Sequence, residues 1–417
     1  MWGVPQWMMG GYGMRGREIL VSGAGIAGLA LAYWLRRYGF GVTVVERAPE
    51  PRTGGQAVDV RGTARDVVER MGLLAEVRAH HTGTRGIAFL DENGRRMARM
   101  GADTFGDSGG VVADLEILRD DLQRLLHREA REGVDYLFAN HIVAMAEGDE
   151  GVRVDFAHGS SRVFDVVVGA DGIRSGVREL AFGDSAGHLR DLGQYSALFR
   201  ARLDTDLDGW EQMCLLPGTG TTRGRAVVVY PVGEDGEVRV MLMFAAPSAG
   251  WERKGVREQK DYLERVYADA GWVVPELMGY LRRADDLYFN RDARVRAPRW
   301  SDGRSVLVGD AACGGSLGMG TSMAFVGAYV LAGELAAADG DHRAAFAAYE
   351  RALSDYARAN SRRPPGEIAP NTRWGIRARG WILRTATRVP GGGKLMGDMQ
   401  RTANMVSLRD YPGPVRN

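Results

Sequence analysis

Residues 18–46, EILVSGAGIAGLALAYWLRRYGFGVTVVE, decide the fold of this chain. A short apolar run at 19–21 leads into a glycine-rich turn, and an apolar stretch typical of a buried helix follows as far as Gly39. A second strand pattern at 42–45 ends on Glu46. A strand, a helix and a parallel strand within about 30 residues make a βαβ unit. The sequence therefore predicts an α/β fold with a Rossmann-like nucleotide-binding domain.

The glycine-rich turn has the form GxGxxG, with Gly23, Gly25 and Gly28 at its fixed positions and Ala27 before the last. The first glycine permits a tight turn, and the second lets the backbone approach a pyrophosphate. The third allows the helix to pack closely on the strand. Glu46 lies eighteen residues after Gly28, where an acidic side chain accepts hydrogen bonds from ribose hydroxyls. The pattern predicts one tightly bound dinucleotide.

The residue after this acid leaves one point open. Glu46 favours an adenosine with a free 2′-hydroxyl, whereas Arg47 beside it would tolerate a 2′-phosphate. No second GxGxxG follows in the chain, since GTGTTRG at 218–224 has the wrong spacing. We therefore expect no separate domain for a second dinucleotide.

Two further apolar runs end in glycine and aspartate. They are FDVVVGADG at 164–172 and SVLVGDAA at 305–312. In open α/β sheets ligands bind outside the carboxyl ends of the strands, so three distant segments are expected to form one site. Asp310 would be costly after a buried strand unless it accepts hydrogen bonds from a ligand. Asp171 either contacts the ligand or caps a helix that starts near Ile173.

The residue pattern between these segments predicts a second domain. Residues 86–111 and 188–285 alternate as antiparallel strands do, with a hairpin turn at 233–236 and a helix over 257–285. We expect them to form a mostly antiparallel β-sheet substrate domain. The nucleotide-binding domain then consists of residues 18–85, 112–187 and 286–340. Residues 1–17 are expected to be a disordered extension, and residues 341–417 a C-terminal helical segment.

Composition excludes several classes of protein. Lys and Arg number 54 against 53 Asp and Glu, so the basic excess of a nucleic-acid binder is missing. The two cysteines cannot form a disulfide scaffold, and the seven histidines show no metal-ligand spacing. Neither a signal peptide nor an uninterrupted membrane span is evident in the sequence. We expect a cytoplasmic monomer or homodimer without metal.

The C-terminal segment is basic. From Ser361 onward there are ten Arg and one Lys against three acidic residues, a net charge of +8. Trp374, Ile376, Trp381 and Leu383 lie among these charges. We expect a helix that packs against the nucleotide-binding domain, and contact with an anionic membrane is the alternative.

The βαβ unit, GADGIRSGVR at 169–178 and GDAA at 309–312 together resemble the p-hydroxybenzoate hydroxylase-like (group A) FAD-dependent monooxygenases. Over about residues 18–340 the chain looks most similar to aromatic-polyketide hydroxylases and tetracycline-inactivating monooxygenases. The resemblance implies bound FAD and NADPH or NADH as a transient reductant. It also implies that O₂ and a C(4a)-hydroperoxyflavin hydroxylate an aromatic or polyketide-like small molecule.

The same resemblance implies roles for single residues. Glu46 would bind the adenine ribose, Arg119 the pyrophosphate–ribose region and Asp310 the ribityl chain. Asp171 would serve both FAD and the nicotinamide donor. Asp59 would contact the flavin, and Arg52 would contact the nicotinamide. The expected cofactor-binding set is Gly23, Gly25, Ala27, Gly28, Glu46, Arg47, Asp59, Arg119, Asp171, Asp310, Gly320, Thr321 and Ser322.

The stretch after GDAA departs from the family pattern. Residues 313–320 read CGGSLGMG, two residues shorter than in relatives and without proline. Cys313 stands where relatives have His or Tyr; it is interpreted as a small buried residue, with redox participation or covalent flavin linkage as alternatives. The apolar stretch that follows predicts a buried helix, capped by Thr321 or Ser322, whose N-terminus points at the flavin.

Substrate contacts are expected on the strands of the second domain, where apolar and aromatic side chains are frequent. The candidates are Tyr195, Phe199, Tyr230, Met243 and Phe244. No catalytic base is identifiable from the sequence. Two alternatives to hydroxylation stay open, a flavin-dependent dehydrogenase or reductase of the same fold and a non-catalytic flavin-binding partner protein.

Overall fold

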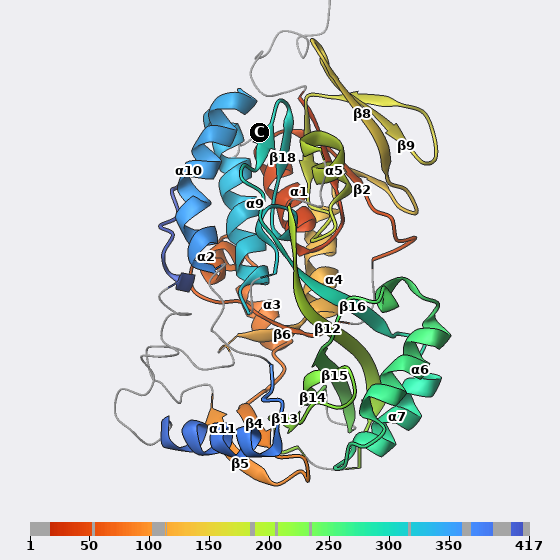
Figure 1. Ribbon diagram of the computed structural model, residues 1–417. Coiled ribbons are helices and arrows are strands. Elements are labelled where there is room, and N and C mark those ends of the chain that lie inside the picture. The colour runs from red at the N-terminus through yellow and green to blue at the C-terminus, as the bar shows by residue number, and fades with distance from the viewer. Residues whose placement is uncertain are drawn as a thin grey trace, which may run out of the picture.

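The computed structural model describes residues 17–51, 55–101, 113, 115–183, 188–204, 207–232, 236–315, 318–360, 368–386 and 402–411. Residues 1–16 of the expected extension, Arg52 and most of the expected hairpin turn at 233–236 lie outside these ranges. Two large sheets organise the described chain, one in each half of the molecule (Figure 1). We take the sheet that contains the βαβ unit, with its helices, as the first domain and the other large sheet, with its helices, as the second.

The six-stranded sheet contains the predicted βαβ unit. Its strands, in order, are β17 (Ser301–Asp302), β18 (Ser305–Leu307), β11 (Val166–Gly169), β1 (Glu18–Ser22), β2 (Gly41–Val45) and β7 (Val134–Leu137). All neighbours pair in parallel except β17, which is antiparallel to β18. The carboxyl ends of β1, β11 and β18 therefore meet at one edge, as the sequence predicts.

Helices cover this sheet. They are α1 (Ile26–Arg37), α2 (Thr63–Arg70), α3 (Leu74–Ala79), α4 (Arg119–Ala130), α5 (Gly176–Phe182), α8 (Asp310–Cys313), α9 (Gly320–Ala337) and α10 (His342–Asn360). Helix α9 packs on α1, α2 and α10 (Figure 1). Among the described residues α9 is the one helix long and apolar enough to cross a membrane, but 78% of it is buried inside the protein. It is thus the central core helix of this domain.

The second large sheet has seven strands. In order they are β16 (Tyr288–Val295), β12 (Leu189–Arg202), β15 (Glu237–Ala245), β14 (Arg223–Pro231), β13 (Trp210–Leu216), β4 (Gly86–Leu90) and β5 (Arg96–Gly101). Only β13 and β4 pair in parallel. The early strands at 86–101 thus join the later ones in one mostly antiparallel sheet. Strand β16 corrects the expected boundary at residue 286, because it pairs with β12 rather than with the first sheet.

The remaining described elements include two small sheets, one 3₁₀ turn and two helices. Strand β3 (Ala57–Asp59) pairs with β6 (Glu116–Leu118), and β8 (Ile142–Gly148), β9 (Gly151–Phe156) and β10 (Arg162–Phe164) form a separate antiparallel sheet. A 3₁₀ turn, η4, spans Trp251–Arg253. The helix expected over 257–285 is in fact two helices, α6 (Val256–Tyr267) and α7 (Val274–Arg283). Trp272 lies between them with a φ of 54°, which a continuing helix does not allow.

One face of the seven-stranded sheet packs on α6 and α7. Tyr195 and Phe244 lie on this face with no exposed surface, and their rings stack with centroids 5.4 Å apart. Leu263 of α6 and Leu277 of α7 belong to the same apolar core. This placement corrects the expectation that Tyr195 and Phe244 line a substrate space, because the helices close that face.

The opposite face turns toward the first domain. Arg239 of β15 forms an ion pair of 3.5 Å with Asp120 of α4. Tyr230 and Met243 are on this face, since Tyr230 opposes Arg239 and the side chains of a strand alternate. Phe199 is on the other face with Tyr195 and is also buried. Of the five expected substrate contacts, Tyr230 lies near the nucleotide-binding domain, close to Ala57. Met243 packs instead against the apolar cluster that contains Leu215 and Ile376.

The C-terminal segment divides between the two domains. Helix α10 packs on α9, but α11 (Arg373–Ala386) packs on β5 and β13, which corrects the expectation that the basic helix covers the first domain. Ile376 anchors α11 in an apolar cluster, while 79% of Trp374 is exposed. Residues 402–411 return to the first domain, where the Tyr411 hydroxyl donates to the Glu334 carboxylate over 2.8 Å.

The contact between Tyr411 and α9 gives a testable prediction. A Cβ atom at Gly333 would overlap the Tyr411 ring, so Gly333→Ala should displace the 402–411 segment. We expect the free energy of unfolding in urea to fall by about 2 kcal/mol, through lost burial of Tyr411.

Gly279→Ala in α7 is the matched control, because a Cβ there meets no atom within 4 Å. It should be neutral or gain up to about 1 kcal/mol from helix propensity. Equal stability of the two variants would contradict a role for Tyr411 in holding the segment.

Candidate functional site

The GxGxxG turn brings the three predicted segments into contact. Gly23 adopts a φ of 108°, and a Cβ there would lie 2.6 Å from the Ala170 carbonyl oxygen and 2.9 Å from the Asp171 Cα. A Cβ at Gly309, after β18, would lie 2.8 Å from the Ala27 Cβ. The ends of β1, β11 and β18 are therefore packed against one another at the start of α1.

Two glycines of the turn have opposite surroundings. A Cβ at Gly28 would overlap the Gly23 carbonyl oxygen, so Gly28 permits the turn and the helix to pack. A Cβ at Gly25 would meet no protein atom within 4 Å. Gly25 is also the N-cap of α1, where backbone N–H groups and the helix dipole attract phosphate. The open space at Gly25 fits a pyrophosphate.

Glu46 is held at the tip of β2 by two backbone amides. Its Oε2 accepts from the Ala24 amide over 2.8 Å, and its Oε1 accepts from the Ala48 amide over 2.9 Å. Each carboxylate oxygen keeps capacity for a further hydrogen bond, so both can accept from ribose hydroxyls. Arg47 beside it is exposed.

Asp171 caps a helix with one carboxylate oxygen, which is one of the two roles that the sequence left open. Its Oδ2 accepts from the amides of Gly176 and Val177 at the start of α5, at 2.9 and 3.2 Å. Its Oδ1 is buried and has no hydrogen-bond partner among the described residues. Burial raises the pKa of Asp171. One oxygen thus holds the helix, and the other is a buried acceptor that fits a hydroxyl donor of a ligand.

Asp310 and Arg119 lie near each other at the same edge. Asp310 opens α8, and a Cβ at Gly320 would lie 3.5 Å from its Oδ1, so the carboxylate is beside the start of α9. The surrounding protein raises the pKa of Asp310, and the positive charge of Arg119 opposes this shift. The Asp310 side chain keeps an exposed surface, so a ligand can reach it.

Asp59 and Ser322 both contact Arg61, so the segment that follows β3 is joined to α9. Asp59 accepts from the Arg61 guanidinium at 2.8 Å, and Ser322 Oγ accepts from the Arg61 amide at 3.2 Å. Ser322 is therefore not the cap of α9. The N-cap is Met319, with no side-chain hydrogen bond, which corrects the expectation for Thr321 and Ser322.

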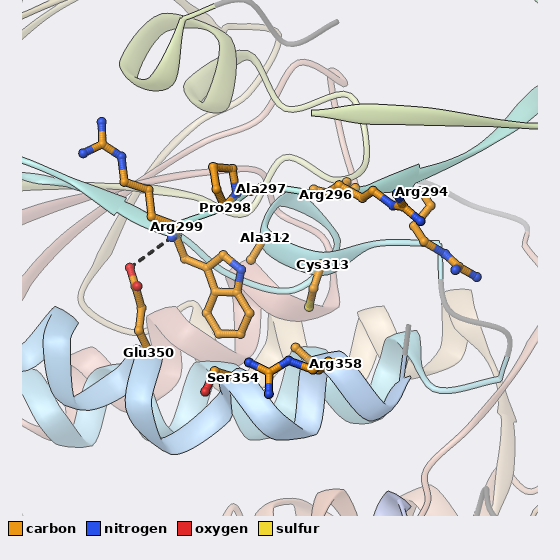
Figure 2. Close-up of a pocket in the computed structure, with 13 residues that line it drawn as sticks. Arg294, Arg296, Ala297, Pro298, Arg299, Ala312, Cys313, Glu350, Ser354 and Arg358 are labelled. Carbon is orange, nitrogen blue, oxygen red and sulfur yellow. Dashed lines mark hydrogen bonds between the residues drawn. The ribbon is translucent and has the colours of Figure 1, made fainter. Parts of the chain in front are cut away.

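A separate cavity of about 310 Å³ borders α8 and α10. Cys313 and Arg358 lie on its wall (Figure 2). At the same cavity the Trp300 amide donates to Glu350 over 3.0 Å. Burial raises the pKa of the Cys313 thiol, so this group stays protonated at neutral pH. Cys313 is only half-buried and lies on the cavity wall, so it is less enclosed than the interpretation as a small buried residue expects.

The sequence analysis missed one titratable group at the domain boundary. Glu211 of β13 lies near Glu116 and Asp59, and burial together with these charges raises its pKa to about 8. Glu116 is itself buried and accepts from the hydroxyls of Thr82 and Thr84. The signal available in the sequence was a single acid within the strand WEQMCLL at 210–216.

The fold and this site define a dinucleotide-binding oxidoreductase of the Rossmann type. The family model described as "FAD binding domain" matches residues 17–363. An uncharacterized protein of Mycobacterium tuberculosis is 38% identical over 400 residues, covering 95% of this chain and 100% of the relative. A flavin-dependent monooxygenase of an unknown prokaryotic organism is 34% identical, covering 82% and 87%.

Solved structures give the same result. The chain superimposes on tetracycline destructase Tet(51) with a TM-score of 0.76 and 28% identity, covering 95% of this chain and 99% of the other. HpxO of Klebsiella pneumoniae, complexed with FAD and uric acid, shares the fold with a TM-score of 0.65, 21% identity and 94% coverage of both chains. The chain belongs to the FAD-binding domain family. It is an FAD-dependent monooxygenase, and FAD is its cofactor.

Substitution by valine should have different outcomes at Gly25 and at Gly28 of the GxGxxG turn. Gly25→Val should fold with a melting temperature like that of the apoprotein, because space is open there, yet it should lose most bound FAD. Gly28→Val should fail to fold stably, because its side chain would overlap the backbone of the turn. Flavin absorbance after gel filtration and circular dichroism measure the two effects. Full FAD content in Gly25→Val would contradict the pyrophosphate placement.

Glu211 predicts a pH dependence of stability. Its pKa rises from an ordinary 4.5 to about 8, so between these values the native state holds a proton that the unfolded chain has released. This contribution to the free energy of unfolding is complete below about pH 4.5 and is lost as the pH rises to about 8. Glu211→Gln should therefore flatten the fall in stability with pH.

The control for this measurement is Glu276→Gln, at an exposed position of α7. Urea titrations at several pH values compare the two variants with the wild type. An unchanged slope in Glu211→Gln would show that this carboxyl titrates normally.

Proposed function

We propose that the protein takes electrons from NADPH or NADH through FAD and uses O₂ to hydroxylate an aromatic or polyketide-like small molecule. One observation carries the proposal. Gly25, Asp171 and Asp310 lie at one edge of the first domain, the proposed FAD edge, and the sheet face with Tyr230 and Arg239 contacts that domain through Asp120. Such an arrangement offers a cofactor and a partly apolar surface to one substrate.

The chain's own residues position the cofactor. FAD, when bound, supplies the transfer of electrons between the nicotinamide and oxygen. Glu46 would accept from its ribose, and the amides after Gly25 would bind its phosphates. The start of α9, fixed by the Ser322–Arg61 contact, brings the positive end of a long helix beside Asp310. Arg119 would neutralise charge in the same region.

The proposed class of substrate is based on the proteins to which this chain is similar. Tet(51) is named a tetracycline destructase, and its likeness to this chain covers 95% of the chain. We therefore propose a multi-ring phenolic compound as substrate, with tetracycline as the first test compound. Arg52 is proposed as a nicotinamide contact, and a cytoplasmic monomer or homodimer is proposed for the working enzyme.

The test uses the purified full chain. We expect a yellow protein that oxidises NADPH faster when tetracycline or another phenolic polyketide is added. One oxygen atom from ¹⁸O₂ should appear in the product. Asp310→Asn should reduce FAD affinity by about tenfold or more, because a charge-assisted hydrogen bond contributes roughly 1.5–3 kcal/mol.

Asp302→Asn, on β17, is the matched control for Asp310→Asn, because this partly exposed carboxylate pairs with Arg299 away from the FAD edge. Stimulated NADPH oxidation without labelled product would favour the dehydrogenase or reductase alternative. NADPH oxidation that no aromatic compound changes would favour a non-catalytic flavoprotein.

A further inference from the structure

Helix α11 presents an apolar face to solvent. In the part of the chain that the structure describes, the three most exposed large apolar side chains all belong to this helix: Trp374, Trp381 and Ile382, with 79%, 68% and 57% of their surface exposed. Trp374 and Trp381 are seven residues apart, about two turns of a helix, so they lie on one side, and Ile382 borders them. Single exposed apolar residues are ordinary, but a group of three with two tryptophans marks an interaction surface.

The opposite side of α11 fixes this orientation. Ile376 is buried in an apolar cluster with Met97 of β5, and a Cβ at Gly380 would overlap the Met97 side chain. The Arg384 guanidinium donates to the Met97 carbonyl oxygen over 3.0 Å. The tryptophans therefore cannot turn inward unless these contacts break. Helix α11 lies at the lower end of the molecule in the view of Figure 1, with β4 and β5 beside it.

The charge of α11 is positive throughout. Its 14 residues include four arginines and no acidic residue. Arg377 is exposed and has no hydrogen bond or ion pair with any described residue. Arg373 pairs with Glu92 over 3.6 Å, but 74% of its side chain is exposed. Arg96 and Arg99 are exposed on β5, the strand on which the helix packs. The helix therefore fits a partner that is both apolar and anionic.

We propose that the outer face of α11, formed by Trp374, Trp381 and Ile382, docks on an anionic lipid bilayer. Tryptophan is favoured where headgroups meet acyl chains, because its ring has an apolar body and a polar N–H. Arginines beside it are attracted to anionic headgroups. The helix would lie on the bilayer surface without crossing it. The proposal is independent of the proposed reaction, since no residue of the FAD edge belongs to α11.

A second copy of this chain fits the same face less well. A symmetric dimer uses the same patch on both subunits, so it would bring the arginines of two α11 helices together. Like charges placed opposite each other disfavour an interface, and α11 has no acidic residue to offset them. Charge therefore favours the bilayer over a dimer through α11.

Vesicle flotation of the FAD-loaded full chain tests the proposal. Vesicles of phosphatidylglycerol and phosphatidylcholine in equal amounts are compared with vesicles of phosphatidylcholine alone. We expect the anionic vesicles to bind at least about tenfold more tightly, since several arginines contribute. Binding should weaken in about 1 M salt, which screens exposed charges.

Two variants separate the apolar face from the rest of the surface. Trp374→Ala combined with Trp381→Ala should weaken binding to the anionic vesicles at least about tenfold, because two interfacial rings are lost. Val143→Ala combined with Val163→Ala is the matched control. It removes exposed apolar surface from β8 and β10, and it should bind as the wild type does. Both variants should keep full FAD content.

A second pair of variants tests the charge. Arg377→Gln should weaken binding to the anionic vesicles about fivefold, the effect of one arginine near an anionic surface. Arg351→Gln, at an exposed position of α10, is its control and should stay within about twofold of the wild type.

Fluorescence shows whether the tryptophans enter the bilayer. Brominated lipid in the anionic vesicles should quench part of the wild-type tryptophan emission. Trp374→Phe combined with Trp381→Phe should abolish this quenching, because the other tryptophans stay outside the bilayer.

Three results would overturn the docking surface. The first is no flotation with the anionic vesicles, and the second is equal loss in the tryptophan variant and in the valine control. The third is binding without quenching, which would mean adsorption through charge alone. A dimer that dissociates in the tryptophan-to-alanine variant would assign the face to a second copy instead. FAD content and NADPH oxidation would be unchanged in each case, so these failures are distinct from failure of the proposed function.

Discussion

The parallel pairing of β1, β11 and β18 is the constraint on which the rest of the structure depends. Val21 opposes Val168, and Val168 opposes Val306, so the three strands end level with one another. The chain then leaves each strand through a glycine, and these turns touch at Gly23 and Gly309. A slip of one residue would reverse the side chains of a strand and remove Asp171 or Asp310 from the edge. The edge at which we propose that FAD binds therefore follows from strand register.

The sequence was sufficient for this part because its signals are local. A glycine pattern, an apolar run and an acid at a fixed spacing each describe a few neighbouring residues, and parallel strands bring their ends together. It was insufficient for contacts between distant residues. The helix-capping prediction for Ser322 was wrong because this hydroxyl binds the backbone of Arg61, which is 261 residues away. The Tyr411 hydroxyl likewise donates to Glu334, which is 77 residues away.

The seven-stranded sheet shows a second limit of sequence patterns. Alternation places Tyr195 with Phe199 on one face and Ser196 with Leu198 on the other, but it does not say which face meets which domain. The answer depends on α6 and α7, whose apolar residues cover the face of Tyr195. The same limit explains α11, whose buried Ile376 packs on the sheet domain instead of the nucleotide-binding domain.

Unpaired buried polar atoms occur on both sides of the domain boundary. Folded proteins pair nearly all such atoms, so each exception requires a reason. The Asp171 Oδ1 is an acceptor at the FAD edge, and FAD supplies hydroxyl donors. The Tyr230 hydroxyl and the Arg239 Nε are donors on the facing sheet, and both FAD and a substrate carry acceptor oxygens. Unpaired buried atoms of both polarities therefore flank the boundary between the two domains, where the proposed function requires cofactor and substrate to meet.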